Sequence, residues 1–285
     1  MVKKPIIALM YDFDNTLSPG AMQTYDFMKL IHTTPDVFWG ETNELDVREK
    51  MDPNLSYMYL MLVKARECGF HPTREWFEKL GASVELYPGL TKWFERINAY
   101  GESKGAIIEH YVISSGLREM INGTHINKYF KRVYACEYLY GPDGEAIWPK
   151  SVVNYTTKTQ FLFRISKGAF ELADDEVVNK HMPETMKHCP FRNMIYIGDG
   201  STDIPCMQLV RDRGGESIAV YPDAKNKTIA QGLLKDNRVS FMERADYSAN
   251  SSLDKTVKAI IDKMVTNDLL AQKRYNQTNS LPDED

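Results

Sequence analysis

Short apolar runs alternate with longer amphipathic stretches along this chain, and several of the runs end in carboxylate, serine or glycine residues. The runs that show this most clearly are Ile6–Tyr11, His110–Gly116 and Met194–Ile197. Runs of this length with apolar residues on both faces are typical of strands buried in a parallel sheet. The chain is therefore predicted to contain a buried sheet whose strands end in polar groups.

The rest of the pattern switches between strand-like and helix-like segments. Further strands are predicted at 133–140 and 145–148, on either side of a turn at 141–144, and at 217–221 and 239–242. Amphipathic periodicity predicts helices at 90–100, 158–165 (with Thr156 or Thr157 as its N-cap), 227–234 and 252–271. Strands that alternate with helices are typical of α/β proteins. We predict a doubly wound, three-layer parallel sheet.

The segment after the first strand has a helical pattern and shows no strand-like alternation. Helices are predicted over Tyr25–Ile31, Tyr57–Ala65 and Pro72–Leu80. This segment is interpreted as a small helical unit inserted into the α/β fold. The predicted division of the chain is an α/β core at 1–18 and 86–272, a helical insert at 19–85, and a flexible acidic tail at 273–285.

Length and charge narrow the classes of protein that the pattern allows. The chain has 285 residues, enough for one α/β domain with an insert of this size. Its formal net charge of −4 argues against a nucleic-acid partner, because binding to the phosphate backbone usually needs a concentrated basic surface. No window of about 18 apolar residues occurs, so no membrane span is expected.

The N-terminus and the cysteines favour a cytoplasmic protein. Lys3 and Lys4 before an apolar run imitate a signal peptide, but the run is short, lacks a small-residue cleavage site and stops at Asp12. The 4 cysteines are scattered and form no C-x-x-C pair. Such spacing is typical of reduced thiols rather than of a disulfide framework or a zinc site.

Two carboxylates, Asp12 and Asp14, follow the first predicted strand, and Thr16 comes two residues later. In open α/β sheets the ligand crevice lies beyond the carboxyl ends of the strands. Two acids crowded into such a poorly solvated place are costly unless a cation or a catalytic task accounts for them. The alternative is an ordinary Asx turn, in which Asp and Asn only shape the backbone.

Two more strand ends and one lysine carry candidate groups. Ser114 ends the second strand, where a simple turn serine would also fit. The third strand runs into Gly-Asp-Gly, whose aspartate is Asp199, and a second acid, Asp203, follows four residues later. The alternative there is a glycine-rich turn in which Asp203 caps the next helix. Lys158 opens a predicted helix, although most lysines are solvated surface groups.

Taken in order, these residues match a known set of motifs. Asp12-Phe13-Asp14-Asn15-Thr16 resembles the first motif of the haloacid dehalogenase-like (HAD) hydrolase superfamily. Ser114, Lys158 and the segment Gly198–Asp203 follow in the order of its later motifs. The helical insert resembles the type 1 cap of this superfamily. The whole layout looks closest to its phosphoserine phosphatase-like branch, which implies a Rossmann-like core.

The resemblance implies a Mg²⁺-dependent phosphatase that works through an aspartyl-phosphate intermediate. Asp12 would be the nucleophile, and Asp14 the general acid for the leaving alcohol and then the base that activates water. The metal ligands implied in this way are Asp12, the backbone carbonyl of Asp14, Asp199 and, as an outer or occasional ligand, Asp203.

The resemblance also implies a phosphate-binding set. Its members would be Ser114, the backbone amides of Ser115 and Gly116, and Lys158, which would neutralise both Asp12 and the phosphate. The choice of lysine stays open, because Lys150 and Lys167 lie nearby in the sequence. Lys158 is favoured because it opens a helix.

A cap that closes over the site predicts a small phosphorylated metabolite as substrate. Phosphoserine phosphatases commonly have an acid about nine residues after the nucleophile, but here Ala21 stands at that place and Gln23 close by. The substrate is therefore left open, as are the oligomeric state and two other functions. One is a phosphomutase or phosphotransferase with the same core, and the other is a non-catalytic protein that binds a phosphorylated ligand.

Overall fold

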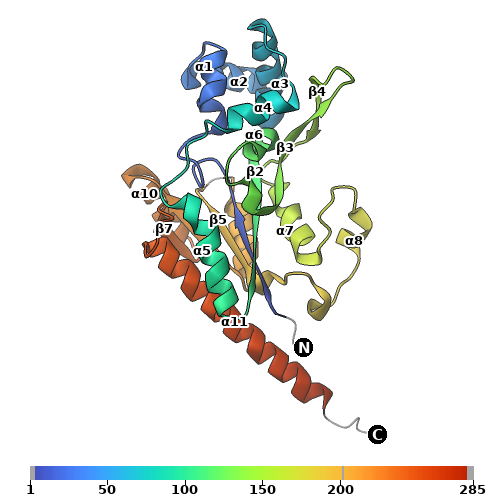
Figure 1. The fold of residues 1–285 in the computed structure, drawn as a ribbon, viewed down its shortest axis with the longest axis vertical. Coiled ribbons are helices and arrows are strands. Elements are labelled where there is room, and N and C mark those ends of the chain that lie inside the picture. Colours follow the sequence, from blue (N-terminus) through green and yellow to red (C-terminus); the bar gives the residue numbers. More distant parts are fainter. Residues whose placement is uncertain (1–3, 201, 281–285) are drawn as a thin grey trace.

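A computed structural model describes residues 4–200 and 202–280, and a seven-stranded sheet with helices on both faces forms its centre (Figure 1). The strand order is β4-β3-β2-β1-β5-β6-β7, and every pair is parallel except β3–β4. The order runs outward in both directions from β1, which confirms the doubly wound sheet. The strands are β1 Ile6–Tyr11, β2 Ile107–Leu117, β3 Phe130–Tyr140, β4 Ala146–Ser151, β5 Met194–Gly198, β6 Glu216–Tyr221 and β7 Phe241–Arg244.

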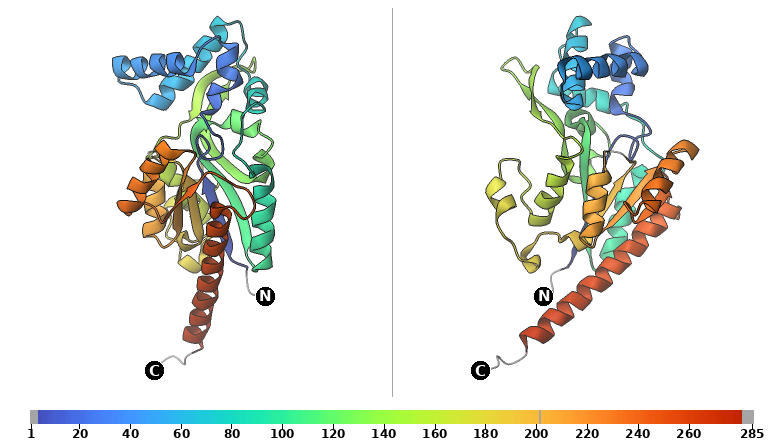
Figure 2. Two further views of the ribbon diagram at one scale, coloured as in Figure 1. Left: turned by 90° about the vertical axis from the view of Figure 1, so that its left-hand side faces the viewer. Right: turned by 180° about the vertical axis from the view of Figure 1, so that it is seen from behind.

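Helices cover both faces of the sheet and make the fold three-layered (Figure 2). On one face α5 packs against β2, and α11 packs against α5 and β7. On the other face α7 contacts β2 and α9, and α9 contacts β5 and β6. The helices of the core are α5 Leu90–Ser103, α6 Arg118–Asn122, α7 Lys158–Lys167, α8 Asp175–Asn179, α9 Ile204–Asp212, α10 Ala224–Lys235 and α11 Ser252–Asn279.

The central strand positions the site. Residues Ile7 to Tyr11 of β1 are completely buried, as expected for a strand covered on both faces. Tyr11 lies opposite Val112 of β2 and Ile197 of β5. Because parallel strands end at the same edge of a sheet, this register brings the residues that follow β1, β2 and β5 together there.

The insert between β1 and α5 forms a helical unit at that edge of the sheet, at the top of Figure 1. Its helices are α1 Asp26–Leu30, α2 Pro35–Glu49, α3 Pro53–Glu67 and α4 Arg74–Gly81. The helix predicted at 25–31 is therefore only 5 residues long, and α2 was not predicted. Of the residues of α2 only Phe38 and Thr42 are buried, so the helix has no apolar stripe to reveal it. Its N-terminal signal was present, since Thr34 caps the helix and Pro35 is its first residue.

The helical unit also contacts the core outside its two linkers, residues 12–25 (the first linker) and residues 82–89 (the second linker). Tyr57 of α3 donates a hydrogen bond to the carbonyl of Ser115 (2.8 Å), and Tyr138 of β3 donates one to the carbonyl of Met58 (2.7 Å). Helices α4 and α6 pack backbone against backbone, because a Cβ on Gly81 would lie only 1.9 Å from the carbonyl oxygen of Met120. The unit is therefore held by β2, β3 and α6 as well as by the chain that connects it.

Two predicted helix ends differ from the structure. Helix α11 continues to Asn279, so the first part of the tail predicted at 273–285 is helical rather than flexible; residues 281–285 lie outside the described part of the chain. No proline or glycine follows Ala271 before that point, so nothing stops the helix. Helix α7 has no side-chain cap from Thr157; instead the Asn154 side chain accepts from the amides of Thr156 (3.1 Å) and Thr157 (3.0 Å).

Among the described residues no helix is long and apolar enough to cross a membrane.

Candidate active site

Asp12 stands at the carboxyl end of β1 and is almost fully buried, with 6% of its surface exposed. Its amide donates to the carbonyl of Ile197 (3.0 Å), which ties the residue to β5. Its Oδ1 accepts from the amide of Phe13 (2.7 Å) and lies 3.1 Å from Nζ of Lys158. The carboxylate is thus held in one orientation by a backbone N–H and a buried cation.

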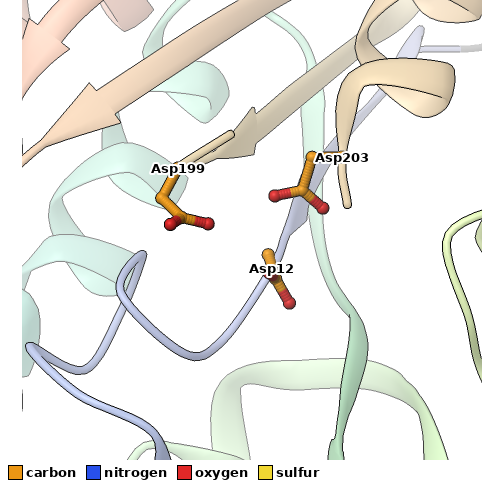
Figure 3. Close-up of side chains that lie close together, drawn as sticks. All are labelled: Asp12, Asp199 and Asp203. Atoms are coloured by element: carbon orange, nitrogen blue, oxygen red, sulfur yellow. The ribbon is translucent and has the colours of Figure 1, made fainter. Parts of the chain in front are cut away.

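Three carboxylates meet at this point (Figure 3). Asp12, Asp199 and Asp203 each offer one oxygen, and these oxygens lie within 4.8 Å of one another. Asp199 follows β5, whereas Asp203 directly precedes α9. Asp203 does not cap α9 with its side chain, which removes the turn-and-cap interpretation for this residue. Gly198 makes room for it, because a Cβ there would lie 2.3 Å from Oδ2 of Asp203.

Lys158 is the cation of this cluster. It is completely buried at the start of α7, and its Nζ lies 2.7 Å from Oδ1 of Asp203 as well as 3.1 Å from Asp12. Burial alone would lower the pKa of Lys158, but the carboxylates of Asp12 and Asp203 outweigh it and raise the pKa above its ordinary value. The lysine is therefore charged and bridges the first and last of the candidate motifs.

Among the described residues Lys158 is the one cation paired with the three carboxylates, which leaves the cluster with excess negative charge. Burial raises the pKa of Asp12 to about 6, and the nearby Asp203 adds to the effect while Lys158 opposes it. Burial likewise raises the pKa of Asp199 to about 8, with Asp203 and Asp12 as the next causes. Such shifts mean that a further cation at this place would be strongly favoured.

The donor set fits Mg²⁺. This ion prefers a few carboxylate oxygens and completes its shell with water. The buried Oδ2 of Asp203 has no hydrogen-bond partner among the described residues, which is the state expected of an oxygen reserved for a ligand. Asp12, Asp199 and Asp203 are thus the residues that would hold the ion.

Asp14 is not one of the three clustered carboxylates, although it is near enough to feel the charge of Asp12. Its Oδ1 accepts from the amide of Met22 (3.0 Å), at the first residue of the short 3₁₀ helix Met22–Thr24. Burial raises the pKa of Asp14 to about 8, with the charge of Asp12 as the second cause. Asp14 therefore keeps its proton to a higher pH than an ordinary carboxyl group and can donate it. Its implied metal contact would be through its backbone carbonyl and stays a prediction.

The end of β2 carries the three other predicted phosphate-binding residues. Ser114 is buried, and its Oγ accepts from the amide of Gly116 (3.0 Å). This amide, expected to bind phosphate, is therefore engaged within the last residues of β2 itself. The carbonyl of Ser115 accepts from Tyr57. A Cβ on Gly116 would lie 2.2 Å from Cε of Met22, so the side chain of Met22 packs directly against this glycine.

Two residues of the site could not be found from motifs. Tyr196 of β5 donates to Oδ1 of Asp203 (2.8 Å) and helps to orient it. Met22 holds Asp14 through its amide, and its Sδ accepts from the amide of Leu117 (3.2 Å). Tyr196 acts through its hydroxyl on a residue seven positions along the chain, and Met22 acts through its backbone amide and its sulfur. A pattern of residue types does not encode such contacts.

The carboxylate cluster predicts how metal and pH act on stability. Because the folded-state pKa values of Asp12, Asp14 and Asp199 are raised, the folded protein binds protons more tightly than the unfolded chain between about pH 4 and 8. The stabilising effect of those protons is complete below that range and is lost as the pH rises through it. At higher pH bound Mg²⁺ should stabilise the folded protein instead. At a hundred times its Kd, the ion should raise the free energy of unfolding by about 2.7 kcal/mol.

We therefore expect Mg²⁺ to raise the melting temperature more at pH 8 than at pH 5, relative to EDTA at the same pH. Comparing the two conditions at each pH cancels the contribution of other titrating groups. Asp199→Asn should shrink the shift, and Asp174→Asn, which changes an exposed aspartate, should not. An equal shift at both pH values would argue against metal binding by the cluster.

Sequence comparison relates this chain to a protein whose function is not described. No family model matches the chain. A protein of Borreliella burgdorferi, described only as uncharacterized, is 29% identical over 279 residues, which cover 88% of this chain and 95% of that protein.

Solved structures give the clearer likeness. A HAD family hydrolase from Salmonella enterica serovar Typhi aligns with a TM-score of 0.54 at 15% identity, over 84% of this chain and 67% of that one. A probable phosphoserine phosphatase from Vibrio cholerae aligns at 0.56 and 15%, over 95% and 67%. A phosphoserine phosphatase with a phospho-aspartyl intermediate analogue aligns at 0.51 and 15%, over 90% and 99%. The fold is that of the HAD hydrolases. The predicted resemblance, including its phosphoserine phosphatase-like layout, is confirmed at the level of the fold.

Proposed function

We propose that this chain is a Mg²⁺-dependent phosphatase that hydrolyses a small-molecule phosphomonoester through an aspartyl-phosphate on Asp12. The observation that carries the proposal is the pairing of two unlike acids at one strand end. Asp12 is held beside the cation of Lys158 at 3.1 Å, while Asp14, two residues on, has a pKa raised to about 8. Two carboxyl groups whose surroundings give them different protonation states are suited to two different tasks.

The first half of the reaction would use both acids. A carboxylate oxygen of Asp12 attacks phosphorus, and the bond from phosphorus to the leaving oxygen breaks. Asp14 gives its proton to that oxygen, so the alcohol leaves neutral. Lys158 lowers the cost of bringing an anionic phosphate to an anionic nucleophile. Mg²⁺, when bound by Asp12, Asp199 and Asp203, would supply further positive charge to the transferred group.

The second half would reverse the task of Asp14. Now a carboxylate, Asp14 takes a proton from water, whose oxygen attacks phosphorus and displaces Asp12. Phosphate leaves, and both acids return to their starting states. The helical unit lies at the edge of the sheet where β1 ends (Figure 1), and a cap at that place supports a small substrate.

The direct test is phosphate release from a panel of small phosphomonoesters, with Mg²⁺ or with EDTA. We expect release with Mg²⁺ and none with EDTA. Release that appears only when an alcohol acceptor is added, as a new phosphomonoester, would favour a phosphotransferase instead. Binding of phosphorylated compounds without release or transfer under any condition would favour a non-catalytic protein.

Asp14→Asn separates the two half-reactions. With p-nitrophenyl phosphate, whose leaving group needs little protonation, we expect a burst of about one p-nitrophenolate per enzyme and then little turnover, because the base of the second step is missing. With an alkyl phosphate the burst itself should be slowed by about 10²–10⁴-fold. Rapid-mixing measurements of both substrates test this. Steady turnover of p-nitrophenyl phosphate at the wild-type rate would remove Asp14 from the mechanism.

A further inference from the structure

The loop between β7 and α11 contacts both linkers that join the helical unit to the core. This loop spans residues 245–251, and its Tyr247 is completely buried. Its hydroxyl donates to the carbonyl of Thr16 in the first linker (2.8 Å), and its amide donates to the carbonyl of Pro88 in the second (2.9 Å). The two linkers are also bonded to each other, through the amide of Tyr87 and the carbonyl of Leu17 (3.0 Å).

The Thr16 carbonyl belongs to the turn that carries Asp14. The carbonyl of Phe13 accepts from the amides of Thr16 (3.2 Å), Leu17 (2.8 Å) and Ser18 (3.1 Å), so the turn is one compact hydrogen-bonded unit. Asn15 lies within it in the left-handed region, with φ of 57°. A unit of this kind moves as a whole, and holding the Thr16 carbonyl therefore holds Asp14.

Tyr247 is itself fixed to the core. Its ring meets the indole of Trp93 edge-on, with centroids 5.1 Å apart at 85°. Its carbonyl accepts from Nη2 of Arg96 (2.6 Å), whose Nε in turn donates to Asp254 (2.9 Å). A Cβ on Gly89 would lie 2.3 Å from the amide nitrogen of Ser248, so the loop and the second linker touch backbone to backbone. The hydroxyl of Tyr247 is thus a fixed donor presented to the Asp14 turn.

We propose that Tyr247 is a positioning residue for Asp14. By holding the turn, it keeps the Asp14 carboxyl group where it can give its proton to the leaving oxygen. This inference rests on the proposed function. Thr16 is fully buried, so without the hydroxyl its carbonyl would be left without this donor in a place closed to water. The turn would then shift to satisfy it, and Asp14 with it. Asp12 would stay in place, because its amide is bonded to β5 and its carboxylate to Phe13 and Lys158.

Tyr247→Phe removes only the hydroxyl and tests this division. The rate of alkyl-phosphate cleavage, which needs the proton from Asp14, should fall about 10- to 100-fold. The p-nitrophenolate burst, which needs little protonation, should change in rate by less than about threefold, as should the affinity for Mg²⁺. The measurements are rapid-mixing kinetics with both substrates and Mg²⁺ titration by calorimetry.

Tyr138→Phe is the matched control. Tyr138 is also completely buried and also donates to a backbone carbonyl, that of Met58, but it lies outside the Asp14 turn. It should lower the melting temperature about as much as Tyr247→Phe and show no difference between the two substrates. An equal loss in the rate of the first step on both substrates in Tyr247→Phe, or no loss in that rate, would overturn the positioning role while leaving the proposed function intact. A wild-type protein that cleaves neither substrate would overturn the proposed function and the positioning role with it.

Discussion

Asp12→Asn should abolish phosphate release and at the same time stabilise the metal-free protein. An amide cannot form the phosphoenzyme, so turnover should fall by at least about 10⁴-fold, the scale seen when a covalent nucleophile is removed. No phosphorylated protein should be trapped by acid quench. Both effects on activity follow from the position of this side chain beside Lys158 in the carboxylate cluster.

The expected gain in stability has a different cause, the removal of a buried negative charge. At pH 8 the ionised Asp12 is held in a site that raises its pKa to about 6, mainly by burial and then by the charge of Asp203. Replacing it by a neutral group removes a cost on the order of 1–3 kcal/mol. The denaturation midpoint in EDTA should therefore rise for Asp12→Asn and stay unchanged for Asp174→Asn.

A fall in activity together with a rise in stability distinguishes a catalytic loss from a folding defect. A variant that is inactive and also less stable would leave misfolding as an explanation, whereas an inactive and more stable variant would not. If Asp12→Asn kept more than a few per cent of the wild-type rate, the aspartyl-phosphate mechanism would be wrong for this protein.

The strand ends were predictable because their chemistry is local. A buried apolar run that stops at Asp12 and another that stops at Asp199 must end at one edge of a parallel sheet, and the residue types there match the needs of phosphoryl transfer. The choice of Lys158 also depended on a local feature, its place at the start of a helix. The structure puts it 2.7 Å from Asp203, 45 residues along the chain.

What could not be predicted depends on contacts between distant segments. The bond from Tyr247 to the carbonyl of Thr16 joins residues 231 positions apart, and it involves a backbone oxygen that every residue type possesses. Helix α2 escaped detection for a related reason, since its partners are few and it has no apolar stripe. Periodicity reveals burial against a core, and neither case leaves that trace.

The fastening of the helical unit changes how the site should be pictured. The sequence favoured a cap that closes over the substrate. In the structure the unit is bound to the core by hydrogen bonds to Ser115 and from Tyr138, and by the close packing of α4 on α6. Movement about the linkers alone would break these contacts. The positions of Asp12 and Asp14 should therefore depend on contacts within the core, such as those of Lys158 and the Asp14 turn, rather than on closure of the helical unit.

Lys158→Met is expected to have the largest combined effect on stability and activity. The side chain is fully buried, and its removal leaves Asp12 and Asp203 without their shared cation. Breaking a buried ion pair from one side typically costs about 3–5 kcal/mol. Phosphate release should fall at least about 10²-fold even in the fraction that folds, because the charge that offsets nucleophile and phosphate is lost.

The control variants decide among the three lysines. Lys167→Met removes a side chain whose Nζ donates to the carbonyls of Val178 and Lys180, and Lys150→Met removes one that pairs with Glu137 at 2.9 Å. Both should keep activity within about threefold of wild type, since neither contacts the carboxylate cluster. Adding Asp203→Asn to Lys158→Met should recover stability, by removing a stranded charge, without recovering turnover. Loss of activity in Lys167→Met with activity kept in Lys158→Met would reassign the phosphate-binding role, and the ion pair at the cluster would then be purely structural.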